Sequence, residues 1–310
     1  MPAWVRLHGM DMTALIIANE HANWGAGRHR VRQATEFLRR QGWDFSLAVT
    51  GFPGHAQELA AAAAAQRTAT VVVIGGDGTV NEVINGLVRS ERDYTPCVGI
   101  IPAGSSNDFS KSLGLPQDLE GACRAILKGR VRSVDVGRAG VHCFASASCA
   151  GYFARVAARS LEARRLRGSL RYVLPALGVI REMTEGWEME VRTEDGRVYH
   201  GTYAVLLVGN APRFGGLTML PRARPDDGVL VGLLIEMMSR WEALRLIPRV
   251  YRQALDGHRR VQRFQATSFS VTLRRPTQLC NDGEMVPGVF ESIDYRLLPQ
   301  RLPVYGGARE

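Results

Sequence analysis

The segment Gly75-Gly76-Asp77-Gly78-Thr79 combines residue types that suit the binding of phosphate groups. Glycines permit a tight turn and let backbone N–H groups approach an anion with no Cβ in the way. A helical pattern starts at Thr79, and the amino end of a helix offers unpaired N–H donors and a positive dipole end. Asn81 and Glu82 lie in its first turn. We therefore predict a phosphate-binding turn, the alternative being a glycine turn without a ligand.

Two other phosphate-binding motifs are absent from the sequence. It contains no GxxxxGK[ST] loop, and Thr79-Val80-Asn81 does not complete the GxGxxG pattern of dinucleotide-binding turns. The glycine turn directly follows the β-branched run Val71–Ile74, which is typical of a strand buried on both faces. The carboxyl ends of such parallel strands are where open α/β sheets bind ligands.

Two acidic turns stand in the second half of the chain. Pro225-Asp226-Asp227-Gly228 precedes a strand-like run, and Asn281-Asp282-Gly283-Glu284 follows another. Either can be an ordinary β-turn, because Asp, Asn and Gly all favour turns. In an extended segment, however, residues two apart share a face, so Asp282 and Glu284 could approach one site.

Three sequence blocks resemble the diacylglycerol kinase catalytic domain, which sphingosine kinases and YegS-like bacterial lipid kinases share. Residues 75–87 (GGDGTVNEVINGL) match its signature. Residues 101–116 (IPAGSSNDFSKSLGLP) match its second block, with Ser105 in a threonine position, and residues 49–60 match a third. One departure is Glu20 after Asn19, where the family has proline. The matches continue into the last quarter of the chain, so the resemblance spans nearly its whole length.

The resemblance implies a site for ATP and Mg²⁺. The residues implied to bind the nucleotide are Asn19, Thr50, Gly75, Gly76, Asp77, Gly78, Thr79, Val80, Asn81, Glu82, Gly104, Ser105, Asn107 and Asp108. Among them, Asp77 and Asp108 are expected to hold catalytic Mg²⁺ through water. A structural Mg²⁺ is implied at the first acidic turn, held by the Asp227 carboxylate and the backbone carbonyls of Arg224 and Val229, since Mg²⁺ prefers oxygen ligands.

The second acidic turn is implied to carry the catalytic carboxylate. In this family a carboxylate takes the proton from the lipid hydroxyl as its oxygen attacks the γ-phosphorus. We favour Asp282 as this base, with Glu284 as a metal ligand or orienting residue. Positioning and charge neutralisation would supply most of the rate acceleration, as is usual in phosphoryl transfer.

The implied function is an ATP-dependent lipid kinase that acts on diacylglycerol, phosphatidylglycerol or a sphingoid base. One alternative is an NAD-kinase-like phosphotransferase, which shares the GGDGT motif. The Asp227 turn and the Asp282 and Glu284 pair favour the lipid kinase. The other alternative is a catalytically silent nucleotide-binding module, against which the intact acidic pair argues.

The order of elements predicts how these residues are positioned. The chain has 310 residues, enough for about two domains. Up to residue 134, apolar strand-like runs alternate with helical patterns, which predicts a three-layer α/β nucleotide-binding domain around a parallel sheet. Residues 135–298 contain alternating strand patterns and two arginine-rich helical segments, which predicts a mostly antiparallel β-sandwich or barrel with helical insertions. The resemblance implies that this part is a β-sandwich lipid-substrate domain. The family fold implies that residues 299–310 return to the first domain.

The net charge of +9 belongs mainly to the second half. Residues 153–171 and 240–263 each sum to +5, mostly through arginine. Such segments can be solvated helix faces, or they can contact an anionic membrane, where each surface arginine contributes about 1 kcal/mol. We expect no nucleic-acid binding, because no recognised motif accompanies the charge.

Location and assembly follow less directly from the sequence. The five cysteines form no CxxC pair, and no apolar run approaches the roughly 20 residues that cross a bilayer. We therefore expect a reduced, cytoplasmic protein that contacts the inner face of the membrane. Nothing in the sequence indicates an oligomeric state.

Overall fold

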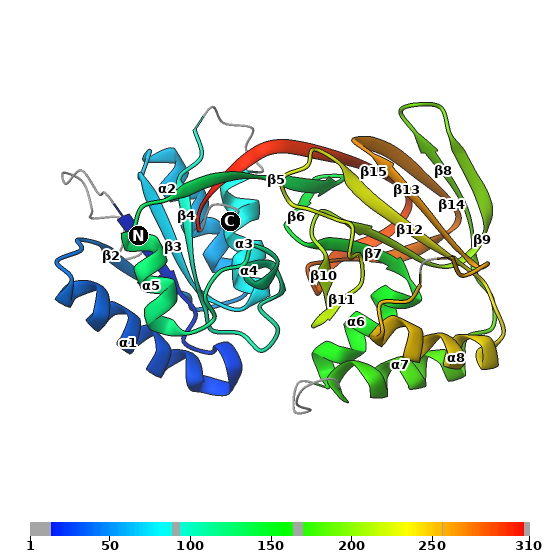
Figure 1. Cartoon of the computed structure of the whole chain (residues 1–310), viewed down its shortest axis with the longest axis horizontal. Coiled ribbons are helices and arrows are strands. Elements are labelled where there is room, and N and C mark those ends of the chain that lie inside the picture. Colours follow the sequence, from blue (N-terminus) through cyan, green and yellow to red (C-terminus); the bar gives the residue numbers. More distant parts are fainter. Residues whose placement is uncertain (1–13, 89–93, 164–169, 256, 307–310) are drawn as a thin grey trace. The chain divides into compact units, whose positions relative to one another are not determined.

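The computed structural model describes residues 14–88, 94–163, 170–255 and 257–306, which form two compact units (Figure 1). The first unit contains the chain up to Gly104, the segment Pro116–Arg132 and the chain from Leu302. The second unit contains Ser105–Leu115 and Ser133–Arg301.

The first unit is built on a parallel sheet. Its strands are β1 (Ala14–Ala18), β2 (Ser46–Val49), β3 (Thr70–Gly75) and β4 (Cys97–Pro102), in the order β4-β3-β1-β2. Every residue of β1 and β3 is buried, as expected for strands covered on both faces. The end of β15 (Glu284–Tyr305) adds a parallel pairing beside β4, with Val304 opposite Val98.

Helices cover both faces of this sheet. On one face, α1 (Ala26–Arg40) and α5 (Leu119–Leu127) pack against alternate strand residues such as Ile16, Val72 and Ile101. On the other face, α2 (His55–Ala65) and α3 (Asp77–Val88) pack against each other and against β1 and β3. The predicted three-layer α/β architecture is therefore confirmed.

The second unit is dominated by an antiparallel sheet. Its main path is β13-β12-β9-β7-β14-β15, and β8 pairs with both β14 and β9. The bounds of these strands are β7 (Ala147–Gly151), β8 (Trp187–Thr193), β9 (Val198–Gly209), β12 (Leu230–Glu236), β13 (Val261–Ala266) and β14 (Ser268–Asn281). The prediction of an antiparallel, β-rich C-terminal part is confirmed.

Shorter elements complete the second unit. β5 (Val131–Ala139) pairs with β6 (His142–Phe144) and with β15, and β10 (Arg213–Phe214) pairs with β11 (Leu217–Thr218). The helices are α4 (Asp108–Ser112), α6 (Tyr152–Glu162), α7 (Leu170–Glu182) and α8 (Arg240–Tyr251). Both α6 and α8 lie in the predicted arginine-rich segments; Arg164, Arg165 and Arg167 lie outside the described residues.

Two further findings concern the cysteines and the length of the helices. All five cysteines are free thiols. Within the described ranges, no helix has the length and apolar character that crossing a bilayer would demand.

A single glycine controls how closely α2 and α3 approach. A Cβ on Gly86 would collide with the backbone oxygen of Gln57 and lie 2.9 Å from the Cβ of Ala60. The alanine-rich face of α2 and this glycine together permit the close contact of the two helices. Gly178 of α7 is a contrasting case, since a Cβ there would meet only the Arg159 guanidinium, at 3.2 Å.

We predict opposite effects of Ala at these two glycines. Gly86→Ala should lower the free energy of unfolding by ~1–3 kcal/mol, because backbone must shift to admit the methyl group. Gly178→Ala should raise it by up to about 1 kcal/mol, since the Arg159 side chain can move and Ala favours helix. Urea denaturation measures both. Equal stability of Gly86→Ala and the unmodified protein would contradict the packing argument.

Candidate active site

The glycine turn lies at the topological switch point of the first unit. β1 stands between β3 and β2, so the chain leaves β1 toward one side and returns to β3 on the other. Such a point opens a crevice at the carboxyl ends of the strands, where α/β sheets bind ligands. Asn19 follows β1, and Gly75 ends β3. The Asn19 backbone N–H donates to the Ile74 carbonyl at 2.9 Å, which joins the two strand ends.

The glycines of the turn are required by its own packing. A Cβ on Gly75 would lie 2.6 Å from the Cβ of Thr79, and one on Gly76 would lie 3.0 Å from the Cα of Gly104. Thr79 Oγ1 accepts a hydrogen bond from the Asn19 amide at 3.2 Å. The structure thus brings Asn19, the glycine turn and Gly104 together, with Asp77 as the first residue of α3.

Thr50 completes this edge of the sheet. It directly follows β2, and its N–H donates to the Ala18 carbonyl at 2.9 Å. Its side chain is buried.

Two predicted nucleotide-binding residues are engaged inside the first unit. The Glu82 carboxylate accepts the N–H groups of Gly54 and Ala56, at 2.9 and 3.2 Å, and so satisfies the amino end of α2. Val80 is buried, and its N–H donates to the Gly76 carbonyl. Asn81 lies one turn before Asn85, whose amide donates to it. Glu82 and Val80 therefore take part in the packing around the turn.

Ser105, Asn107 and Asp108 belong to the second unit. Ser105 Oγ accepts a hydrogen bond from Arg171 of α7 at 3.0 Å, and Asn107 precedes α4 with a positive φ of 51°. The neighbouring Ser106 hydroxyl lies 3.2 Å from the Tyr172 hydroxyl. These contacts join the 105–108 segment to α7.

Asp108 holds the β10–β11 hairpin. Its buried carboxylate accepts the Gly216 N–H at 2.8 Å and lies 3.4 Å from Nε of Arg213. Burial raises the pKa of Asp108 above its ordinary value, although the Gly216 N–H and the cations Arg213 and Lys111 oppose this. Arg213 also donates to the Gly216 carbonyl, so one ion pair fixes both sides of the hairpin turn.

The Asp227 turn is organised by Asp135, which sequence reasoning missed. Both Asp135 carboxylate oxygens accept backbone N–H groups, one from Gly228 at 2.9 Å and one from Gln300 at 2.7 Å. The Asp135 N–H donates to the Pro225 carbonyl at 2.6 Å. The sequence signal for Asp135 was its position between Val134 and Val136 in a strand-like run. An aspartate in such a run is expected to be buried, and a buried carboxylate needs partners.

Asp227 itself is exposed at the turn. Although the residue is exposed, the turn removes part of the water around its carboxyl, and this partial desolvation, together with the nearby charges of Asp135 and Asp226, raises the pKa of Asp227, while the Val229 N–H opposes this. Within the described ranges no three His, Cys, Asp or Glu side chains gather around one point. A cation here would therefore depend on one carboxylate and backbone carbonyls.

The second acidic turn separates its two acids. Asp282 stands in the left-handed region at φ 51°, and its carboxylate accepts the N–H groups of Ala145, Ser146 and Ala147 at 2.7, 2.8 and 3.0 Å. Glu284 begins β15 and is exposed. Asp282 thus clamps the turn to the start of β7, while Glu284 projects from the neighbouring strand end.

A buried amide links the two acidic turns. The Asn210 side chain donates to the carbonyl of Asp135 at 2.8 Å and to that of Ala145 at 2.9 Å. Asn210 is 0 % exposed, so both bonds are needed to offset its burial. The Gly-Asn pair after an apolar run was its only sequence signal.

Asp108 makes a pH-dependent contribution whose sign can be tested. Because its folded pKa is raised, its contribution is greatest below the ordinary value of 3.8 and is lost as the pH rises through the folded pKa. As the pH rises from 4 to 8, the free energy of unfolding of the unmodified protein should therefore fall relative to that of Asp108→Asn. Urea denaturation measures this difference. Asp195 is the control: its bonds with Arg197 and Thr193 lower its pKa, so its contribution is lost only below the ordinary value of 3.8, and Asp195→Asn should run parallel to the unmodified protein between pH 4 and 8. Parallel curves for Asp108→Asn and the unmodified protein would exclude this effect.

Comparison with known proteins gives matches over both units. Residues 13–139 match the family model described as diacylglycerol kinase catalytic domain. Residues 146–306 match the YegS C-terminal NAD kinase beta sandwich-like domain. A diacylglycerol kinase of Staphylococcus saprophyticus is 30% identical, with 82% of this chain and 83% of that protein covered. A Pectobacterium atrosepticum protein named "probable lipid kinase YegS-like" is also 30% identical, covering 78% and 79%.

Solved structures share the fold. The structure of a diacylglycerol kinase from Bacillus anthracis has a TM-score of 0.75 at 22% identity, covering 95% of this chain and 97% of that one. Yeast NADH kinase in complex with NADH has a TM-score of 0.54 at 11% identity, covering 95% and 82%. At these identities the likeness concerns the fold alone. By its matches to the two family models, the chain belongs to the diacylglycerol kinase and YegS-like family and is a lipid kinase, a phosphotransferase with an alcohol as acceptor.

Proposed function

We propose that this protein transfers the γ-phosphoryl group of ATP to the hydroxyl of a membrane lipid, with diacylglycerol as the first candidate acceptor. The observation that carries the proposal is the glycine turn at the switch point of the first unit, followed directly by the amino end of α3. The name of the Staphylococcus saprophyticus relative supports diacylglycerol over phosphatidylglycerol and sphingoid bases.

The first unit is proposed as the nucleotide-binding domain. The candidates to contact nucleotide are Asn19, Thr50, Asp77, Gly78 and Thr79, which lie at the carboxyl ends of adjacent strands or at the start of α3. Glu82 and Val80 are assigned to the packing of the turn, because their polar groups already have partners. The predicted boundary between residues 134 and 135 remains part of this proposal.

Mg²⁺ is proposed at two places. Asp77 is the candidate ligand for the ion that accompanies the nucleotide, whereas the contacts of Asp108 assign it to the β10–β11 hairpin. The donor set of the other turn, the Asp227 carboxylate with the carbonyls of Arg224 and Val229, fits the oxygen preference of Mg²⁺. Asp135 and Asp226 lie close enough to act on the Asp227 carboxylate, so a cation here would also offset their charges. The ion would neutralise charge and stiffen the turn.

Glu284 is proposed as the general base and Asp282 as a positioning residue. This reverses the preference drawn from the sequence. The Asp282 carboxylate is committed to three backbone N–H donors, while Glu284 is the exposed acid of the pair. A base must reach the proton that it removes, which favours the exposed carboxylate.

The proposed activity predicts a selective transfer to lipid. With labelled ATP and Mg²⁺, label should enter dioctanoylglycerol and should be absent from NAD, because the two acidic turns match lipid kinases. Parallel reactions with phosphatidylglycerol and sphingosine identify the acceptor, and thin-layer chromatography measures the products. Transfer to NAD alone, or to none of these acceptors, would overturn the proposal.

The two acids of the second turn should respond differently to removal of their charge. Glu284→Gln should keep the stability of the unmodified protein and lower kcat by roughly 10²–10⁴-fold, as loss of a general base does. Asp282→Asn should lower the free energy of unfolding by ~2 kcal/mol, because an amide oxygen cannot replace a carboxylate toward three donors. Urea denaturation and initial rates measure the two effects. If Glu284→Gln retained full activity, Glu284 would not be the base.

A further inference from the structure

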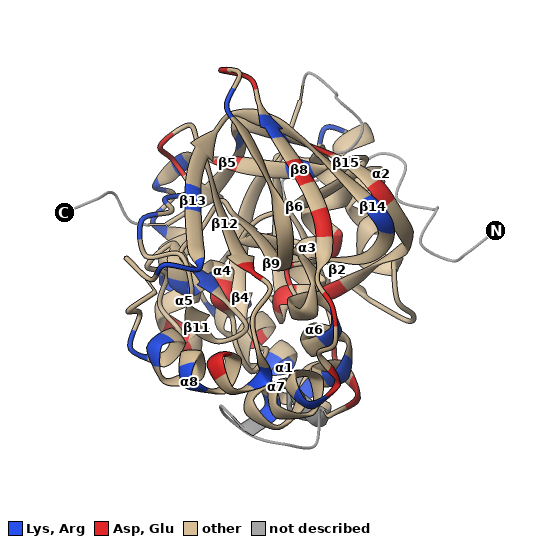
Figure 2. Cartoon of the chain, turned by 90° about the vertical axis from the view of Figure 1, so that its right-hand side faces the viewer, with Lys and Arg blue, Asp and Glu red and all other residues tan. Residues whose placement is uncertain are grey.

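Many arginines of the second unit have structural partners. Figure 2 shows basic and acidic residues intermixed over much of the sheet, with further basic positions on α7 and α8. Arg159 pairs with Glu182, and Arg274 pairs with Glu188. Arg240 donates to the Met183 carbonyl at 2.9 Å. The net charge of the arginine-rich segments therefore overstates the number of arginines available to a partner.

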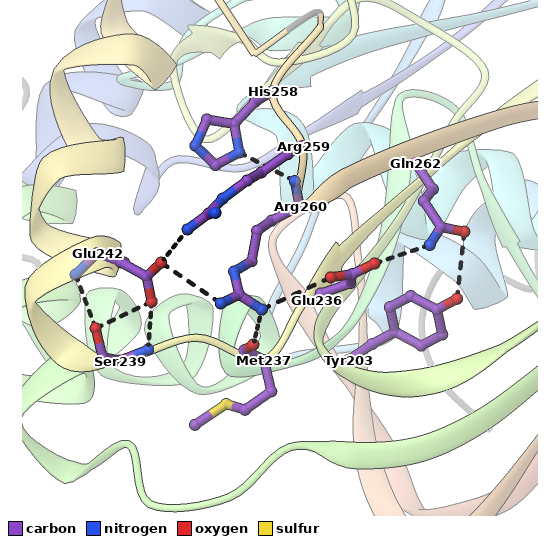
Figure 3. A network of polar contacts seen from close by, with 9 residues as sticks. All are labelled: Tyr203, Glu236, Met237, Ser239, Glu242, His258, Arg259, Arg260 and Gln262. Atoms are coloured by element: carbon purple, nitrogen blue, oxygen red, sulfur yellow. Dashed lines mark hydrogen bonds and ion pairs between the residues drawn. The ribbon is translucent and has the colours of Figure 1, made fainter.

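The amino end of α8 is fixed by such paired residues (Figure 3). Ser239 and Glu242 form a capping box, in which each side chain accepts the backbone N–H of the other residue. The Glu242 carboxylate also accepts Arg259 and Arg260, at 3.0 and 3.5 Å. Arg260 lies 3.7 Å from Glu236 at the end of β12, so α8 is held firmly to the sheet.

The outer face of α8 carries a different set of residues, which we call the α8 stripe. It consists of Trp241, Arg245, Arg249 and Arg252, spaced i, i+4, i+8 and i+11, which places them on one side of a helix. Trp241 is 74% exposed, and all three arginines are exposed. None of the described residues forms a hydrogen bond or ion pair with Arg245, Arg249 or Arg252. The opposite side of α8 buries Ala243 and Leu246.

The neighbouring helix α7 also carries exposed apolar residues. α7 packs against α8. Leu174 and Leu177 of α7 are 50% and 40% exposed, and Arg181 follows them one turn later. With the spacing i, i+3 and i+7, these three residues also share one side of their helix.

We propose that the α8 stripe, with Leu174 and Leu177 of α7, docks on an anionic lipid bilayer. An exposed indole is costly in water and is favourable at the level of lipid headgroups. Arginines without acidic partners keep their full attraction for anionic headgroups, and their aliphatic stems can lie along the acyl boundary. Taken together, the two helices expose an indole, two leucines and arginines, which is the combination of apolar and basic groups found in interfacial anchors. The proposal names where a lipid kinase would meet its substrate, and so rests on the proposed function.

The test measures binding to vesicles without nucleotide or turnover. The unmodified protein should bind phosphatidylglycerol-containing vesicles, bind phosphatidylcholine vesicles weakly and be released by salt, which screens the attraction. Each of Arg245→Gln, Arg249→Gln and Arg252→Gln should lower the partition coefficient about fivefold, and the triple variant about a hundredfold. Trp241→Ala should also weaken binding. The controls are Arg296→Gln and Val289→Ala, which alter exposed residues of β15.

A second measurement locates the contact without relying on the arginine variants. Brominated lipids should quench tryptophan fluorescence in the unmodified protein, and this quenching should be lost in Trp241→Phe. If the stripe variants bound as tightly as the unmodified protein, or if Arg296→Gln weakened binding equally, the proposal would be wrong. Transfer to a monomeric short-chain lipid should be unchanged in the stripe variants. If the unmodified protein did not transfer phosphate to the short-chain lipid, the proposed function would be wrong. The vesicle-binding measurements would still show whether the α8 stripe docks on the bilayer.

Discussion

Capture of backbone N–H groups by carboxylates is the constraint on which the second unit depends. Asp135 accepts hydrogen bonds from the backbone N–H groups of Gly228 and Gln300. Asp282 accepts them from three consecutive N–H groups at the start of β7. Asn210 joins the two by bonding the carbonyls of Asp135 and Ala145. Irregular segments cannot satisfy their own backbone groups, so buried polar side chains must do so. Both acidic turns therefore take their shape from one connected set of contacts.

The same principle appears in the first unit at the glycine turn. Glu82 satisfies the amino end of α2, and Asn19 bonds Thr79 at the start of α3. These contacts leave the glycine turn at the strand ends with little freedom to rearrange. A turn that is already formed loses less entropy when it binds a ligand. The acidic and amide residues around both candidate sites thus act first on the backbone, and only some of them remain for chemistry.

The sequence predicts the architecture better than the role of each polar residue. β-Branched runs such as Val71–Ile74 and the glycine turn after them predict the parallel sheet, because period and composition suffice for buried strands. Asp135 and Asn210 escaped notice because their importance comes from partners more than 60 residues away in the chain. Glu82 and Asp108 match a motif, and they also bond a helix end and a hairpin, which the motif does not indicate. A motif identifies which residues matter, and long-range contacts decide what each one does.

The pairing of β15 with β4 constrains the order in which the fold can form during synthesis, because the two strands lie far apart in the chain. During synthesis β4 is complete long before Leu302–Tyr305 leaves the ribosome, so its outer edge stays unpaired while about 200 further residues are made. An unpaired, apolar strand edge invites pairing with another chain. Val304 then pairs with this edge, and the neighbouring Tyr305 hydroxyl lies 2.8 Å from that of Thr70 on β3. A nascent chain stalled before residue 302 would therefore be vulnerable to aggregation, although all four parallel strands of its first sheet were already made.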